Sequence, residues 1–156
     1  MSDPGSAPDL DALQQVIDRS TRTATASVAD SVAYPGRQMN ASEFVEFFER
    51  VRLLAMATVG AAGQPHIAPV HARLSGQAMR LVVYDNTIRR IDIRSNPRVA
   101  FSSWDDKGAA VIIYGRAHEV PGTIRPASTG SSGKPRRIVE IEVRLTRIYA
   151  MRAPRR

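Results

Sequence analysis

The sequence predicts a mainly β fold, a small antiparallel barrel of six strands with a few short flanking helices. Six short segments have the composition or the two-residue period of strands, and residues typical of hairpin turns separate several of them. The chain has 156 residues, of which 43% are hydrophobic, so it can bury one core but has no room for a second. One domain is therefore expected.

The predicted strands are mostly short and apolar. Gly60 to Pro65 supplies the turn of a first hairpin, and Ser75-Gly-Gln supplies the next. In the last strand apolar and polar residues alternate, which is typical of a strand with one face in water. The strands are expected at residues 53–59, 67–74, 79–84, 98–103, 109–120 and 138–145.

Three helices are predicted. The first is a short amphipathic segment at residues 10–17. The second begins after Asn40 or Ser42 and has an apolar face that packs on the core. The third follows an N-cap at Asn86 or Thr87, and its spacing predicts a buried stripe of Ile88 and Ile91.

These elements divide the chain into three parts. Residues 1–40 are predicted to be an N-terminal extension, weakly structured with one short helix, and residues 41–150 to be the barrel domain. Residues 151–156 are a basic tail. Residues 121–135, rich in Pro, Gly and Ser, are expected to form a lid or an unstructured loop.

Composition excludes several classes of function. The chain has no cysteine, so disulfides and thiolate chemistry are impossible, and we expect a cytoplasmic protein. Its apolar runs are too short to span a bilayer, so no membrane association is expected. Two of its three histidines, His66 and His71, project to opposite faces of one strand, and no metal site is predicted. His66 either lines a pocket or lies on the surface beside Pro65.

The chain is strongly basic, with a formal net charge of +7 and a pI near 10.7. Much of the excess lies between Arg136 and Arg156, and no nucleic-acid-binding motif accompanies it. We therefore do not expect a nucleic-acid partner. A more specific indication of a binding site is the pair Arg89 and Arg90. They lie in the first turn of the third predicted helix, where cations oppose the helix dipole. Either an anion binds there, or both arginines project into water.

The order of motifs resembles that of the pyridoxamine 5'-phosphate oxidase-like split barrels that bind flavins. A hairpin with Gly63-Gln-Pro65 is followed by a strand, the short basic helix, Asn96-Pro-Arg-Val99 and a strand with Gly115-Arg-Ala117. The resemblance covers roughly residues 42–150. It implies a split β-barrel, and a homodimer that binds FMN, or alternatively the deazaflavin coenzyme F420, at the subunit interface.

The resemblance also implies a set of cofactor-binding residues. Thr87 and Arg89 occupy the places of the family's Ser and Lys phosphate contacts, and Arg73 that of another basic contact. By position, the ring would lie near residues 68–70 and the ribityl chain near residues 84–86. Trp104, which is either a stacking surface or a core-edge residue, would contribute across the interface. The cofactor-binding residues are predicted to be Ala68, Pro69, Val70, Arg73, Tyr84, Asp85, Asn86, Thr87, Arg89, Arg90 and Trp104.

The sequence differs from that of the true oxidases at several positions. Ala68 and Ile88 stand where those enzymes carry arginine, and Ala110 stands where they carry glutamine. We therefore expect an oxidoreductase that transfers hydride to a small molecule other than pyridoxamine phosphate, with no catalytic residue assigned. The alternative is a non-catalytic barrel that binds a flavin, haem or another planar ligand. Similarity to small actinobacterial-type members, some of which use deazaflavin, rests on residues 135–143.

Overall fold

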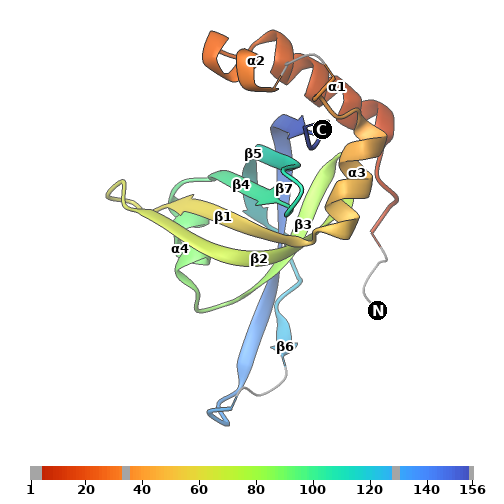
Figure 1. Cartoon of the computed structure of the whole chain (residues 1–156). Coiled ribbons are helices and arrows are strands. Elements are labelled where there is room, and N and C mark those ends of the chain that lie inside the picture. The colour runs from red at the N-terminus through yellow and green to blue at the C-terminus, as the bar shows by residue number, and fades with distance from the viewer. Residues whose placement is uncertain (1–4, 33–35, 128–130, 155–156) are drawn as a thin grey trace.

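The computed structural model describes residues 5–32, 36–127 and 131–154, and its centre is a closed antiparallel barrel (Figure 1). Six strands pair in the order β3-β2-β1-β4-β5-β7, and pairing of β3 with β7 closes the ring. The predicted mainly β, six-stranded antiparallel barrel is confirmed. The barrel strands are β1 (Leu53–Val59), β2 (Pro65–Ser75), β3 (Ala78–Tyr84), β4 (Arg98–Trp104), β5 (Ala110–Glu119) and β7 (Arg136–Met151).

Alternation along each strand determines which side chains fill the barrel. In β1, Leu54 and Met56 are buried, and in β7 Val139, Ile141 and Val143 are buried, while their neighbours face outward. This is the two-residue period of a strand with one apolar face. Outward-facing residues of β2, β3 and β7 are consequently free to line a surface site.

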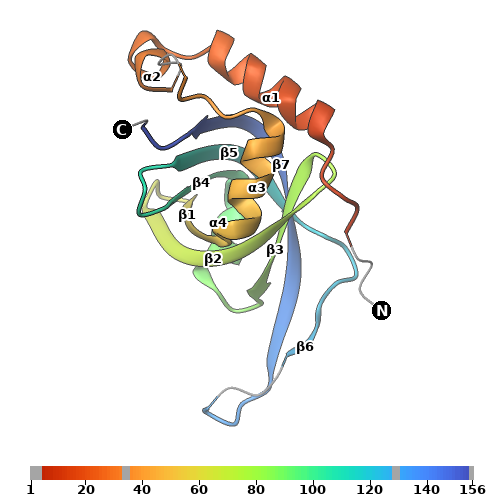
Figure 2. The same ribbon diagram turned by 45° about the vertical axis from the view of Figure 1, so that its right-hand side comes forward.

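Residues 121–135 are more ordered than predicted within the part that the structure describes. They contain a seventh strand, β6 (Arg125–Ala127), which pairs with the beginning of β7. β6 and the first part of β7 project away from the barrel as an arm (Figures 1 and 2). The prediction missed this strand because the Pro, Gly and Ser content of residues 121–135 is typical of loops. Residues 128–130 lie outside the described ranges.

The N-terminal extension is not weakly structured over its described residues, and it has two helices rather than one. α1 (Leu10–Arg22) places Leu13 and Ile17 in the core, and its Ser20 hydroxyl accepts a hydrogen bond from the backbone N–H of Ile148 at 3.0 Å. α2 (Ala26–Val32) follows. Tertiary packing stabilises these segments despite their polar composition. Among the described helices, none combines the length and apolarity needed to cross a membrane.

α3 (Ala41–Arg50) is capped as predicted by Asn40. The Asn40 side chain accepts from the Glu43 N–H, and the Glu43 carboxylate accepts from the Asn40 N–H, each at 2.9 Å. This capping box satisfies two backbone donors at the start of the helix. Buried Phe44, Phe47 and Phe48 then fix α3 against the core.

α4 (Ile88–Ser95) begins after Thr87, but the predicted buried stripe is wrong. Ile88 and Ile91 are both exposed, Ile91 by 61%, whereas Arg90, Asp92 and Ile93 are buried. The helix is turned so that two charged side chains face the barrel, and each finds polar partners there. Those partners make burial of charged groups tolerable.

Candidate functional site

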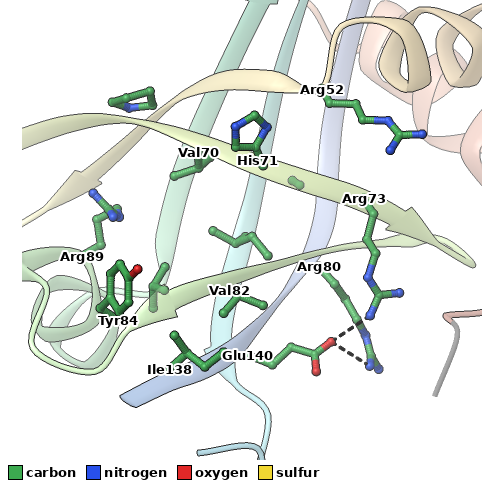
Figure 3. Close-up of a pocket in the computed structure, with 14 residues that line it drawn as sticks. Arg52, Val70, His71, Arg73, Arg80, Val82, Tyr84, Arg89, Ile138 and Glu140 are labelled. Atoms are coloured by element: carbon green, nitrogen blue, oxygen red, sulfur yellow. Dashed lines mark hydrogen bonds and ion pairs between the residues drawn. The ribbon is translucent and has the colours of Figure 1, made fainter. Parts of the chain in front are cut away.

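A cavity of about 590 Å³ opens on the outer face of β2 and β3, beside β7 and the first turn of α4 (Figure 3). We call it the β2–β3 cavity. Its size is typical of small-molecule sites. It is lined by Arg52, Pro69, Val70, His71, Ala72, Arg73, Arg80, Leu81, Val82, Val83, Tyr84, Arg89, Ile138 and Glu140.

The β2–β3 cavity has two polar ends separated by aliphatic side chains. Arg89 and Tyr84 lie at one end, and a group of charged side chains around Glu140 lies at the other, with Val82 and Ile138 between them (Figure 3). An apolar middle with polar ends suits a ligand that carries a flat, largely apolar body and a charged tail.

Two cations at the Glu140 end, Arg73 and Arg80, are paired with carboxylates, and Arg52 donates to the Glu49 backbone oxygen at 3.0 Å. Arg73 donates to Glu140 at 3.1 Å, and Arg80 contacts Glu140 at 3.3 Å and Glu142 at 2.7 Å. The Glu142 hydrogen bond is the main cause that raises the pKa of Arg80 above its usual value. An anion gains little from Arg73 or Arg80 while these carboxylates hold them.

Arg89, at the opposite end, has an unsatisfied donor. Its Nε is buried and has no hydrogen-bond partner, and its guanidinium joins no ion pair, among the residues that the structure describes. Buried polar groups normally find a partner, and an unpaired one is costly. A phosphate or carboxylate in the β2–β3 cavity would satisfy Arg89, so the residues present fit a ligand with an anionic group.

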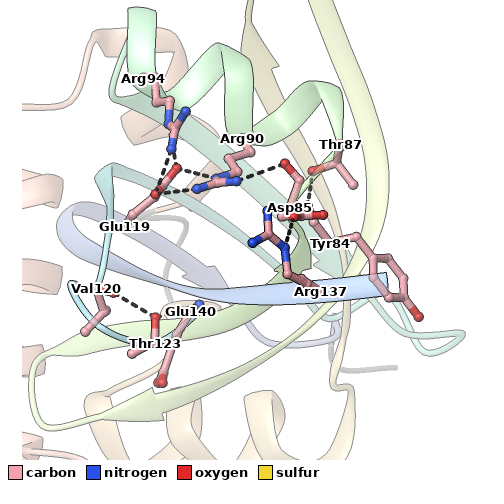
Figure 4. A network of polar contacts seen from close by, with 10 residues as sticks. All are labelled: Tyr84, Asp85, Thr87, Arg90, Arg94, Glu119, Val120, Thr123, Arg137 and Glu140. Atoms are coloured by element: carbon pink, nitrogen blue, oxygen red, sulfur yellow. Dashed lines mark hydrogen bonds and ion pairs between the residues drawn. The ribbon is translucent and has the colours of Figure 1, made fainter. Parts of the chain in front are cut away.

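Arg90, the neighbour of Arg89, serves a different purpose. Its guanidinium donates to both carboxylate oxygens of Glu119, at 2.6 and 3.1 Å, and to the backbone oxygen of Asp85 at 3.1 Å (Figure 4). Arg94 binds the same carboxylate at 2.8 Å. The hydrogen bond from Arg90, followed by that from Arg94, lowers the pKa of Glu119 to about 2. This cluster fastens α4 to the end of β5.

A second anchor of α4 was missed by the sequence analysis. The Asp92 carboxylate is only 2% exposed; its Oδ2 accepts from the Thr58 hydroxyl at 2.6 Å and lies 2.7 Å from His66 Nδ1. Thr58 and His66 are direct partners in the β1–β2 ladder. Asp92 therefore ties α4 to both strands of this hairpin. His66 neither lines the β2–β3 cavity nor lies free beside the turn.

The predicted site residues separate into three groups. Ala68 and Trp104 line a different, neighbouring cavity. Asp85, Asn86, Thr87 and Arg90 line neither cavity; Asp85 binds Arg137 at 2.8 Å, and the Thr87 hydroxyl donates to the Tyr84 carbonyl at 3.0 Å. The β2–β3 cavity brings together Pro69, Val70, Arg73, Tyr84 and Arg89.

The neighbouring cavity, of about 510 Å³, lies over the outer faces of β1, β2 and β4, and we call it the β1–β4 cavity. It is mainly apolar and carries large exposed side chains, with Ile67 75% and Trp104 64% exposed. Pro69 lines both cavities, so the two adjoin. Large exposed apolar patches are typical of protein interaction sites.

The sequence analysis also missed several lining residues, chiefly Arg52, Arg80, Val82, Ile138 and Glu140. The two-residue period of β3 places Arg80, Val82 and Tyr84 on one face, a signal that could have identified the first two. The pairing of β3 with β7 brings Ile138 opposite Tyr84, and no local pattern shows that. No group of three potential metal ligands occurs within the described residues.

Comparison with known proteins places this geometry in context. The model of a family described as pyridoxamine 5'-phosphate oxidase matches residues 41–150, well over half of the chain. No curated protein sequence matches.

Several solved structures share the fold. A FAD-binding protein from Mesorhizobium loti has a TM-score of 0.56 at 15% identity, covering 77% of this chain and 100% of its own. HutZ, the heme storage protein of Vibrio cholerae, has a TM-score of 0.56 at 12% identity, covering 70% and 93%. A protein described as F420 reductase has a TM-score of 0.50 at 19% identity, covering 66% and 93%. At such identities the likeness shows the fold alone.

Proposed function

Because the chain belongs to the pyridoxamine 5'-phosphate oxidase family, we propose that it binds FMN or the deazaflavin F420 in the β2–β3 cavity and acts as an oxidoreductase. The single observation that supports this most is the buried Nε of Arg89, which has no hydrogen-bond partner among the described residues and lies at one end of a cavity with aliphatic walls. An unsatisfied cation beside an apolar slot matches a ligand with a phosphate and a planar ring.

Each part of the β2–β3 cavity has a separate task in this proposal. Arg89, in the first turn of α4, binds the phosphate. Val70, Val82 and Ile138 contact the flat body and exclude water. When bound, the flavin or deazaflavin supplies the hydride chemistry, and the protein supplies position and electrostatics.

Residue differences argue against pyridoxamine phosphate as the substrate. By the resemblance, Ala68, Ile88 and Ala110 replace two arginines and a glutamine of the true oxidases. Ala68 lines the apolar β1–β4 cavity, and exposed Ile88 has no charge to offer a phosphorylated substrate. We infer a less charged small molecule as substrate.

A homodimer is part of the proposal. The β1–β4 cavity offers exposed Leu53, Ile67 and Trp104, and it adjoins the β2–β3 cavity through Pro69. A second copy of the chain seated on this apolar face would cover the cofactor from the open side and keep water away from its ring. Trp104 would then contribute across the interface.

Placing a charge on this face is expected to separate the subunits. The variant Ile67→Asp buries a carboxylate against apolar side chains in the dimer, which is strongly unfavourable. Sedimentation velocity should show a dimer for the wild type and a monomer for Ile67→Asp, with cofactor affinity reduced as well. As a matched control, Ile124→Asp changes an exposed apolar side chain that lines neither cavity, and this variant should remain dimeric. A monomeric wild-type protein with bound cofactor contradicts the dimer.

A non-catalytic binding protein is the second candidate. The solved structures of similar fold include HutZ, whose description is heme storage. Turnover separates the two functions. If protein with bound FMN or F420 exchanges hydride with neither a nicotinamide nor a reduced-flavin donor, while heme binds with a defined Soret band, the oxidoreductase proposal is wrong and the binding function replaces it.

A further inference from the structure

A row of three arginines crosses the outer face of the barrel away from both cavities described above. Arg98 on β4 lies directly opposite Arg116 on β5, and Arg116 lies directly opposite Arg144 on β7. All three side chains are exposed. Since neighbouring strands are about 4.8 Å apart, this arginine row is about 10 Å long.

The arginine row is electrostatically unfavourable by itself, because like charges directly opposite each other on neighbouring strands repel. Within the described ranges none of its guanidinium groups forms an ion pair or donates a side-chain hydrogen bond. Elsewhere on the barrel the one arginine of β3, Arg80, is paired with Glu140 and Glu142. The row lacks such partners, so a bound anion would relieve its repulsion.

A cavity of about 430 Å³ adjoins one end of the row, and we call it the tyrosine cavity. Arg98, Arg116 and Arg147 contribute cations to it, while Tyr114, which is 44% exposed, offers a ring. Edge-to-face contact with Tyr149, at 6.4 Å between ring centroids, holds Tyr114 in place. The cavity has no lining residue in common with the β2–β3 cavity.

A β-bulge shapes the tyrosine cavity. Tyr114 pairs with Arg147 but Gly115 pairs with Leu145, so Thr146 is an extra residue in β7. The bulge leaves Arg144 and Arg147 both exposed although they are three residues apart, which a regular strand would not allow. Gly115 is required at this point, because a Cβ there would lie 2.7 Å from the Arg144 carbonyl oxygen.

We propose that the arginine row and the tyrosine cavity form a binding site for a nucleotide, separate from the cofactor site. Arg116 and its neighbours in the row bind the phosphates, for which the guanidinium fork is well suited. Tyr114 contacts the face of the base. One ring surface beside a short row of three cations has the dimensions of a mononucleotide. A nucleic-acid strand would need a longer basic track.

Calorimetric titration with ADP, adenosine and inorganic pyrophosphate at low salt tests this site. ADP should bind saturably at one site per chain. Arg116→Gln should weaken ADP and pyrophosphate at least tenfold, and Arg98→Gln should do so to a lesser degree. Tyr114→Leu should weaken ADP while changing pyrophosphate affinity less than twofold. Thermal unfolding of each variant verifies folding, and without ligand Arg116→Gln should be no less stable than the wild type.

Two control variants separate this site from net charge and from the cofactor site. Arg125→Gln removes one exposed positive charge on β6, and Arg89→Gln alters the β2–β3 cavity. Both should bind ADP as the wild type does. The proposal is overturned if ADP does not saturate, if Arg125→Gln loses as much affinity as Arg116→Gln, or if Arg89→Gln abolishes ADP binding. Displacement of ADP by single-stranded oligonucleotides with affinity that rises with length would also overturn it, in favour of a nucleic-acid surface.

Discussion

Arg89→Gln should raise the dissociation constant for FMN about 10- to 100-fold. The wild-type guanidinium would make charge-assisted hydrogen bonds to the phosphate, and each such bond contributes about 1.5–3 kcal/mol. Because Arg89 Nε has no partner among the described residues, its loss in the free protein costs no existing hydrogen bond. Flavin fluorescence quenching measures the change, and the fold should remain intact.

Riboflavin, which lacks the phosphate, provides the control for this prediction. Its affinity should be nearly equal in the wild type and in Arg89→Gln, because the lost contact concerns the phosphate alone. Arg125→Gln, which has the same change in net charge, should bind FMN as tightly as the wild type does. Equal weakening of FMN and riboflavin by Arg89→Gln would show that Arg89 supports the fold of the cavity and does not contact the phosphate.

Asp92→Ala should lower the free energy of unfolding by about 2–4 kcal/mol. The buried carboxylate accepts from Thr58 at 2.6 Å and pairs with His66 at 2.7 Å, and hydrogen bonds to charged groups are worth about 1.5–3 kcal/mol each. Removing it leaves the Thr58 hydroxyl buried without this partner. Urea denaturation measures the loss. Because α4 carries Arg89, FMN affinity should also fall in Asp92→Ala.

The variants Asp92→Asn and His66→Gln distinguish the hydrogen bond that Asp92 accepts from Thr58 from its contact with His66. Asparagine keeps an oxygen acceptor for the Thr58 hydroxyl, and glutamine keeps a donor near the position of His66 Nδ1, so each should be less destabilising than Asp92→Ala. If Asp92→Ala unfolds at the same urea concentration as the wild type, Asp92 is not an anchor of α4. If Asp92→Ala is destabilised but binds FMN as tightly as the wild type does, the position of Arg89 does not depend on Asp92.

Local sequence pattern was sufficient for most of the barrel. The strand at Leu53–Val59 has the predicted bounds, and the Asn40 cap is present. These features depend on residues close together in the chain. β7, in contrast, extends from Arg136 to Met151, well beyond the predicted residues 138–145, because β6 pairs with its first residues and β5 pairs with residues 147–151.

The rotation of α4 about its own axis could not be predicted from local sequence pattern. The spacing of Ile88 and Ile91 predicts an apolar buried face, yet Arg90 and Asp92 face the barrel. Their partners, Glu119 and Thr58, are 29 and 34 residues away in the sequence. Only the closed barrel brings them together, so periodicity within eight residues gave the wrong face.

For the same reason, the sequence identified only some of the residues that line the β2–β3 cavity. The sequence singled out Arg89, which lies in the β2–β3 cavity, but also Arg90, which is bound by Glu119. Adjacent helical residues point in different directions, and the choice between them depends on where the barrel lies.

Titration of purified protein with FMN and with F420, followed by visible absorbance, tests the central claim most directly. The proposal predicts a saturable spectral shift with one of these cofactors at one equivalent per chain, and its weakening in Arg89→Gln but not in Arg125→Gln. If neither cofactor shifts the spectrum at micromolar protein, the β2–β3 cavity is not a flavin or deazaflavin site.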